Sequence, residues 1–271
     1  MQTNIKEKVM RKFFLLLLAI FAIAVCEAQS TKTEKKTETR KTAVFKRISM
    51  SGPINVFYTQ GKTCSVKVTA PNDLLKNVKT AVSKETLYVS WEGKSTTTIT
   101  CNGLKELWYA IKTNEFDSNG INVYVTSPDI IEIGLVGSGD FVSRNHIDTD
   151  NLILRLRGAG DMTLSDIICD NIDVELVGSG DINLPKTDVL QSKLSLIGSG
   201  DIDIRQSNTR RTDISLKGSG DIDVAFTGSK CGTANAGLYG SGDITMSGRL
   251  KSLNKNSKGS GDIHTGKLIV K

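Results

Sequence analysis

The tetrapeptide Gly-x-Gly-Asp recurs seven times in the second half of this chain, and it limits the possible folds more than any other feature. The first copy is Gly137-Ser138-Gly139-Asp140, and the last is Gly259-Ser260-Gly261-Asp262. Successive aspartates are 19 to 22 residues apart, which is the length of one structural unit and not of one turn. This period predicts a solenoid.

Apolar residues occupy every second position on both sides of each motif. In the unit that contains Asp181, they are Val174 and Leu176 before the motif, and Ile182 and Leu184 after it. A period of two predicts strands with one buried face. A leucine-rich repeat has a similar length but needs a Leu-x-x-Leu-x-Leu pattern, which this chain lacks. We therefore predict an all-β fold, a right-handed parallel β-helix or β-solenoid with repeats of about 20 residues.

Both glycines of the motif are present in all seven copies, whereas the middle position admits Ala159. This contrast indicates a need for backbone freedom and a missing Cβ, and not for a hydroxyl group. The period of two places the glycines inward and the aspartates outward, as at a corner of the chain. The predicted structural glycines are Gly137, Gly139, Gly158, Gly160, Gly178, Gly180, Gly198, Gly200, Gly218, Gly220, Gly240, Gly242, Gly259 and Gly261.

Residues 1–28 have the pattern of a signal peptide. Basic residues precede thirteen uncharged apolar residues, from Phe13 to Val25, and the Cys26-Glu27-Ala28 ending has the form that signal peptidase reads. The apolar run is shorter than a membrane span, so we expect no transmembrane segment after cleavage. The alternative is lipidation of Cys26. Val25 disfavours it, because a lipoprotein signal has Gly, Ala or Ser immediately before the lipidated cysteine.

The rest of the chain divides into three further segments. Residues 29–42 are charged, nearly devoid of apolar side chains and predicted to be a disordered linker. Residues 43–128 are β-rich but show no repeat, and residues 129–271 hold the seven-repeat β-solenoid. The net charge of +6 is concentrated in the signal peptide and the linker, so we expect no nucleic acid partner.

Several of these stretches together resemble a known family. The stretch Ser51-Gly52-Pro53-Ile54-Asn55-Val56, and the later run from Ile133 to Asp140, are similar to the head GIN domain family, a group described as "putative auto-transporter adhesins" that is typical of Bacteroidota. The resemblance covers about Val44 to Lys271. It implies an exported β-helical protein and offers no known catalytic residue.

The motif aspartates form the most regular polar feature: Asp140, Asp161, Asp181, Asp201, Asp221, Asp243 and Asp262. On stacked coils they would lie about 4.8 Å apart and repel one another unless they are compensated. We expect each carboxylate to accept hydrogen bonds from amides of its own turn. A calcium ladder is the less favoured alternative, because calcium-binding Gly-rich repeats have a nine-residue period.

Enzymatic function is not indicated. A glycosidase needs one pair of carboxyl groups in unlike environments, whereas these aspartates recur equally in every unit. The two histidines, His146 and His264, lie in different repeats without a triad or zinc motif. We expect neither catalytic residues nor a cofactor.

The remaining cysteines allow two interpretations. Cys64 and Cys101 lie in the non-repetitive half and could pair in an oxidising compartment. Cys169 and Cys231 are separated by three repeats, so they are expected to be packed thiols.

One outward line along the solenoid is a candidate binding face. Its polar members are Arg157, Lys217, Tyr239 and Lys258. Val136, Val177 and Ile197 lie at the equivalent positions of other units. Solenoid faces offer long, flat binding surfaces, so we predict a partner site here, although a solvated sheet would vary in the same way.

We predict an exported, non-enzymatic β-solenoid that acts as a binding or adhesion module in the cell envelope or at the cell surface, with a surface glycan or a protein as its partner. Two alternatives remain: a periplasmic structural or stress-linked envelope protein and, less favoured, a carbohydrate-active enzyme. We expect the exported domain in the periplasm or on the outer cell surface.

Overall fold

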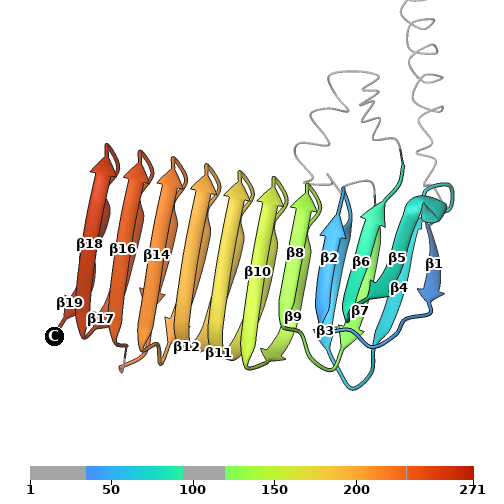
Figure 1. The fold of residues 1–271 in the computed structure, drawn as a ribbon, viewed down its shortest axis with the longest axis horizontal. Helices are drawn as coiled ribbons and strands as arrows, with labels where there is room; N and C mark the ends of the chain where they lie inside the picture. Colours follow the sequence, from blue (N-terminus) through green and yellow to red (C-terminus); the bar gives the residue numbers. More distant parts are fainter. Residues whose placement is uncertain (1–34, 94–119, 230) are drawn as a thin grey trace, which may run out of the picture. The chain divides into compact units, whose positions relative to one another are not determined.

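The computed structural model of the protein describes residues 35–93, 120–229 and 231–271. These residues form strands and one short 3-10 helix, η1 (Leu75–Asn77), with no α-helix among them. The strands stack in two layers (Figure 1), and their parallel stacking forms a β-solenoid of about seven turns. The all-β solenoid predicted from the repeat is therefore confirmed.

The first layer contains the strands that precede the seven Gly-x-Gly-Asp corners and the amino-terminal strands that continue the same row. In order along the stack these are β5 (Val78–Ser83), β6 (Thr86–Trp91), β2 (Arg47–Ser51), β8 (Glu132–Gly137), β10 (Asn151–Gly158), the second half of β11 (Met162–Gly178), the second half of β12 (Ile182–Gly198), β14 (Arg211–Gly218), β16 (Thr233–Gly240) and β18 (Ser252–Gly259).

The second layer contains the strands that follow the seven corners and the amino-terminal strands that continue that row. In the same order these are β1 (Lys35–Arg40), β4 (Ser65–Pro71), β7 (Asn122–Ser127), β3 (Asn55–Gln60), β9 (Phe141–Asp148), the first halves of β11 and β12, β13 (Ile202–Ser207), β15 (Ile222–Phe226), β17 (Ile244–Leu250) and β19 (Ile263–Val270). Neighbouring strands are parallel except in three pairs at the amino-terminal end: β1–β4, β4–β7 and β5–β6.

Equivalent residues of successive coils pair directly. Leu154 lies beside Val174, for example, and Gly158 lies beside Gly178. In the first layer, side chains that point inward on one coil therefore stack on their counterparts in the adjacent coils. In the second layer the register shifts at three pairs, β9–β11, β12–β13 and β17–β19. This in-register stacking converts the alternation in the sequence into continuous lines of apolar and polar side chains.

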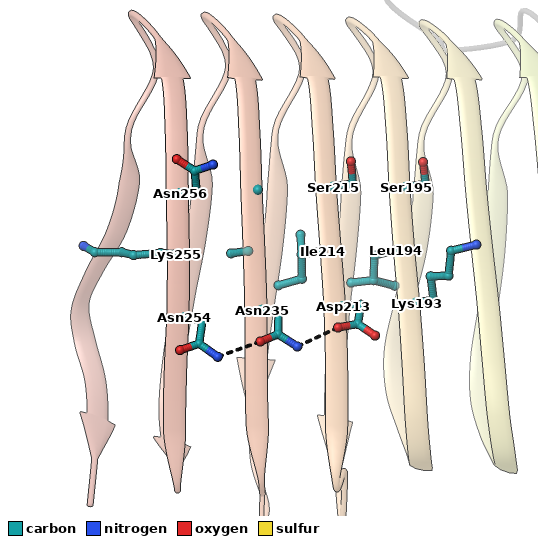
Figure 2. Close-up of a pocket in the computed structure, with 12 residues that line it drawn as sticks. Lys193, Leu194, Ser195, Asp213, Ile214, Ser215, Asn235, Asn254, Lys255 and Asn256 are labelled. Atoms are coloured by element: carbon teal, nitrogen blue, oxygen red, sulfur yellow. Dashed lines mark hydrogen bonds between the residues drawn. The ribbon is translucent and has the colours of Figure 1, made fainter.

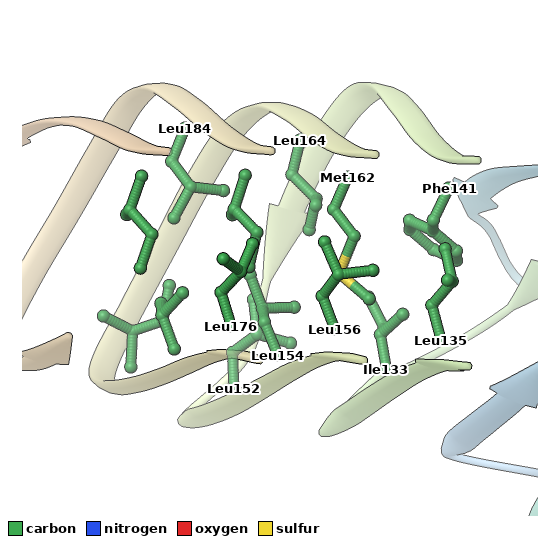
Figure 3. Close-up of a cluster of buried hydrophobic side chains, with 14 of the residues drawn as sticks. Ile133, Leu135, Phe141, Leu152, Leu154, Leu156, Met162, Leu164, Leu176 and Leu184 are labelled. Carbon is green, nitrogen blue, oxygen red and sulfur yellow. The ribbon is translucent and has the colours of Figure 1, made fainter. Parts of the chain in front are cut away.

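The core is the space between the two layers (Figure 3). Leu154 and Leu156 of β10 point across it towards Met162 and Leu164 of β11, and each of the four is fully buried. Because the apolar positions recur with every coil, the core continues along the stack.

The Gly-x-Gly corners bring backbones of adjacent coils close together. The first glycine of each corner has a φ between +127° and +146°, a region that side-chain-bearing residues rarely adopt. At the second glycine the obstacle is space, since a Cβ on Gly180 would overlap the carbonyl oxygen of Gly160. The first glycine meets this obstacle too, since a Cβ on Gly178 would overlap the carbonyl oxygen of Gly158. The corner therefore needs both glycines, the first for its φ and for space, and the second for space.

The amino-terminal half differs from the irregular region that we expected over residues 43–128. Strands β2 and β3 form a coil of the same stack, which lies between the β8–β9 coil and the β6–β7 coil (Figure 1). Gly52, with a φ of +98°, faces Gly137, and Ile54 faces Gly139. The corner is a divergent copy in which Ile54 and Asn55 replace Gly and Asp, so the repeat pattern does not reveal it.

The linker predicted over residues 29–42 is partly wrong. Residues 29–34 lie outside the described part of the chain, but residues 35–40 form β1, which pairs antiparallel with β4. The hydroxyl groups of Thr37 and Thr69 are 2.8 Å apart across this pair. The edge of β4 offers backbone hydrogen-bonding partners to β1, and the β-branched threonines of β1 favour a strand. This pairing stabilises β1 although it has no apolar side chains to bury.

Cys169 and Cys231 are buried thiols, each 6% exposed, as expected. Burial raises the pKa of the Cys169 thiol to about 12, so it is inert at neutral pH. Cys101 lies outside the described residues, so its pairing with Cys64 stays a prediction.

We predict that Gly180→Ala will disrupt the stack, because its Cβ would occupy the position of the Gly160 carbonyl oxygen. The expected loss of stability is at least about 3 kcal/mol in urea-induced unfolding, or failure to fold. Gly134→Ala is the matched control, since the nearest atom to its Cβ would be the Ile48 carbonyl oxygen at 3.9 Å. Equal stability of the two variants would contradict this account of the corner.

Candidate functional site

The motif aspartates form a ladder that joins one coil to the next. The Oδ1 atom of each carboxylate except the last, that of Asp262, accepts a hydrogen bond from the backbone N–H of the next motif aspartate along the chain, at 2.8 to 3.1 Å. We expected bonds to amides of the same turn, and this was wrong. The acceptor lies on one coil and the donor on its neighbour, because equivalent residues stack directly.

The hydrogen bonds at the corner explain why a side-chain acceptor is needed for the amide of each motif aspartate. The carbonyl oxygen of Gly158 accepts two amides of the next coil, from Ser179 at 2.9 Å and from Gly180 at 3.3 Å. The following amide, that of Asp181, bonds instead to the carboxylate of Asp161. The aspartate thus substitutes for a backbone acceptor where the chain turns out of the strand.

The ladder continues into the amino-terminal half with asparagine in place of aspartate. The Oδ1 atom of Asn55 accepts the Asp140 amide at 3.2 Å, and the Nδ2 atom of Asn55 lies 3.5 Å from the Oδ1 atom of Asn122. The neutral amide side chain therefore performs the same bonding. The hydrogen bond between coils therefore does not require a negative charge on the acceptor.

The local environment changes the acidity of the ladder along its length. Burial raises the pKa of Asp140 above its usual range, and the adjacent Asp161 charge acts in the same direction. The hydrogen bond from the Asp262 amide lowers the pKa of Asp243. Within the described residues there is no group of three or more His, Cys, Asp or Glu side chains able to hold a metal ion.

The histidines belong to separate surface pairs. His146 Nδ1 lies 3.3 Å from Asp166 Oδ2, and His264 Nε2 lies 3.3 Å from Asp243 Oδ2. The ammonium group of Lys186, 2.9 Å from the same Asp166 oxygen, lowers the pKa of Asp166. Neither pair includes a nucleophilic side chain.

The structure places all four predicted binding residues on one line across the first layer. We call this line the outer stripe. In register order it consists of Val136, Arg157, Val177, Ile197, Lys217, Tyr239 and Lys258. Tyr239 is 42% exposed and Ile197 is 44% exposed, so the stripe faces solvent.

The stripe has two electrostatically different parts. In the first part Arg157 pairs with Glu175 at 3.3 Å, and Arg155 of the adjacent outward line lies between Glu132 and Glu175. In the second part Lys217 and Lys258 form no ion pair with any other described residue. The Lys258 ammonium group lies 6.0 Å from the centre of the Tyr239 ring.

A groove of about 550 Å³ runs beside this second part (Figure 2). Its floor is low because the outward line next to the stripe carries small side chains on the last coils. These are Ser195, Ser215 and Gly237, followed by Asn256 on the last coil, where earlier coils have Arg155 and Glu175. The run of small residues was visible in the sequence, but our sequence reasoning missed it.

Amide side chains line the far wall of the groove. Asn254 Nδ2 donates to Asn235 Oδ1 at 2.9 Å, and Asn235 Nδ2 donates to Asp213 Oδ1 at 2.7 Å (Figure 2). Arg211 Nε lies 2.8 Å from Asp213 Oδ2, and the hydrogen bond from Arg211 keeps the pKa of Asp213 below its usual range. The Asp213 carboxylate is therefore charged but locally neutralised.

A second hollow of about 480 Å³ adjoins the groove on the same layer. The two share Lys193 and Asp213, and the second hollow is lined further by Asn151, Asn171 and Gln191. Together they extend across the first layer from β10 to β18. We refer to the pair as the long groove.

The chain matches one protein family model and several solved structures over most of its length. Residues 44–237 match the family model described as "Putative auto-transporter adhesin, head GIN domain". Among curated proteins no match is found. Within the described residues no helix is long and apolar enough to cross a membrane.

Several solved structures share the fold. A "putative adhesin" from Bacteroides fragilis is 22% identical, with a TM-score of 0.68, over 86% of this chain and 97% of its own. A "putative adhesin" from Parabacteroides distasonis is 17% identical, with a TM-score of 0.65, over 86% and 97%. A "Putative lipid binding protein" from the same species is 18% identical, with a TM-score of 0.54, over 89% and 98%. At these identities the likeness concerns the fold.

We predict that Asp201→Ala will destabilise the protein by about 1–2 kcal/mol, because the Asp221 amide loses its acceptor. Asp201→Asn should retain most of the stability, as Asn55 does this work in the natural chain. Urea-induced unfolding measures the difference, and hydrogen exchange at the Asp221 amide should be faster only in the alanine variant.

The same variants test the calcium alternative. If calcium raised the melting temperature of the wild type but not of Asp201→Asn, the ladder would be a metal site rather than a hydrogen-bonding device.

Proposed function

The chain belongs to the family of head GIN domain proteins described as "putative auto-transporter adhesins", and from this premise we propose that it is an exported, non-enzymatic binding module of the cell envelope or cell surface. The partner would be a glycan or a protein of that surface. The observation that carries the proposal is the long groove with the outer stripe beside it, a mixed apolar and basic surface on the first layer of the stack.

The stack supports binding because it is preorganised. The strands of the first layer are held by parallel ladders, and their inward side chains are buried in one continuous core. Side chains on such strands hold their relative positions, so a partner that contacts several coils pays little for ordering the surface.

The use of the carboxylates supports a non-enzymatic role. Each motif aspartate except the last accepts the amide of the next one, and the arrangement repeats from coil to coil. Catalysis by paired carboxyl groups needs two of them in unlike environments around one substrate bond. Here the repeated carboxylates hold the corners together.

Export rests on the sequence of residues 1–28, which lie outside the described part of the chain. We propose cleavage after Ala28, with the domain in the periplasm or on the outer surface. Lipidation of Cys26 is the alternative route of attachment. Mass spectrometry of the mature amino terminus separates the two, because a mature chain that begins at a lipid-modified Cys26 would exclude cleavage after Ala28.

We predict that the purified mature protein will bind isolated cell envelopes and that the triple variant Lys217→Ala, Tyr239→Ala, Lys258→Ala will bind at least about tenfold more weakly, since few residues carry most of an interface. Binding is measured as the fraction of protein that sediments with the envelopes, over a concentration series.

The matched control is Lys67→Ala with Tyr124→Ala. These two residues are register neighbours on the second layer, and Tyr124 is 45% exposed, close to Tyr239. Equal loss in both variants, or no loss in the first, would contradict a site on the outer stripe. Protease treatment of intact cells then locates the domain, and cleavage only after lysis would support the periplasmic structural alternative.

A further inference from the structure

We propose that the long groove binds an extended acidic polysaccharide, which lies along the solenoid with its anionic groups against the lysines of the outer stripe. This inference rests on the proposed binding function and names the class of ligand. It follows from the charge, the hydrogen-bonding groups and the repeat geometry of the first layer.

Charge is the first argument. In the long groove each acidic group already has a basic partner: Asp213 has Arg211 at 2.8 Å, and Asp173 has Lys193 at 3.4 Å. Lys217 and Lys258 at its border form no ion pair with a described residue. The border therefore carries a positive charge that an anionic ligand would neutralise.

The hydrogen-bonding groups are the second argument. Asn235 and Asn254 each use one N–H in the amide ladder, and an amide group carries two, so each retains one for a ligand. Ser195 and Ser215 add hydroxyl groups on the floor. Such a mixture of donors and acceptors matches the hydroxyl groups of a sugar chain, which also donate and accept.

The strand pairing disfavours a peptide as ligand. Strands β12, β14 and β16 are each paired on both sides in the first layer, so their backbones offer no free edge for an added strand. A single-stranded nucleic acid would require several aromatic side chains for base stacking. The outer stripe has one, Tyr239.

Repeat geometry is the third argument. Equivalent side chains recur about every 4.8 Å along the stack, so a polymer with a regular repeat can make similar contacts on successive coils. From β10 to β18 there are six strands and five spacings, or about 24 Å. Affinity should therefore rise with ligand length until the ligand spans these coils.

The test uses oligogalacturonates of increasing length and their methyl esters, which share one sugar backbone but differ in charge. Heparin fragments and their desulfated, N-acetylated and carboxyl-reduced counterparts, which are neutral, form a second pair. We expect the acidic form of at least one pair to bind at least about tenfold more tightly than its neutral counterpart, with affinity falling as salt rises. Calorimetry on the mature protein measures the affinity.

Variants locate the site. Lys217→Gln and Lys258→Gln should each weaken binding of the acidic oligosaccharide about threefold to tenfold, since each removes one contacting charge. Asn254→Ala should weaken binding of the acidic and neutral forms by a similar factor. Lys67→Gln on the second layer is the control and should bind as the wild type does.

Three results would overturn the inference: no binding of either acidic ligand, equal binding of the acidic and neutral forms, or binding unchanged in both lysine variants. Tighter binding of single-stranded DNA than of either glycan would identify a different ligand class. Binding to cell envelopes separates this inference from the proposed binding function. If the protein binds envelopes but no acidic glycan, the acidic polysaccharide is rejected as the ligand and the binding function is retained.

Discussion

The close approach of backbones at the Gly-x-Gly-Asp corner is the constraint on which the rest of the structure depends. The second glycine leaves room for the carbonyl oxygen of the neighbouring coil, and the aspartate supplies the acceptor that the turning backbone lacks. A Cβ at the second glycine would force adjacent coils apart at the corner, whereas loss of the aspartate would leave one amide of the next coil without its acceptor. The buried leucines provide the driving force for stacking, but the corner sets where each coil sits.

In-register stacking also determines how the surface is built. Each outward position becomes a line, so substitutions on a few successive coils change the surface over a whole region. The first layer shows this directly. Arginines and glutamates neutralise one another on the β8 to β11 coils, whereas small residues follow on the later coils, beside Lys217 and Lys258 of the outer stripe. A uniform scaffold thereby carries a localised groove without any change in the backbone.

Most of the fold was predictable because its signal is local. Alternation around Asp181 predicted the strands, and the unvarying glycines predicted the corners. The coil formed by β2 and β3 was missed because Ile54 and Asn55 stand at two of its motif positions. Strand β1 was missed because its partner β4, and not its own composition, orders it. The outer stripe was predicted from the repeat. The groove was not, because its shape depends on how the small residues of one outward line combine with larger side chains on neighbouring coils.

The sequence by itself determined the coil length, the two strands per coil, the inward and outward faces and the positions of the corners, since each is encoded within one repeat. Only the tertiary structure decided the order in which coils stack and the coil to which each aspartate bonds. Placement of the β2–β3 coil between β8–β9 and β6–β7 requires pairing between strands far apart in the chain. Such pairing depends on which edges meet when the chain folds, and no local pattern contains that information.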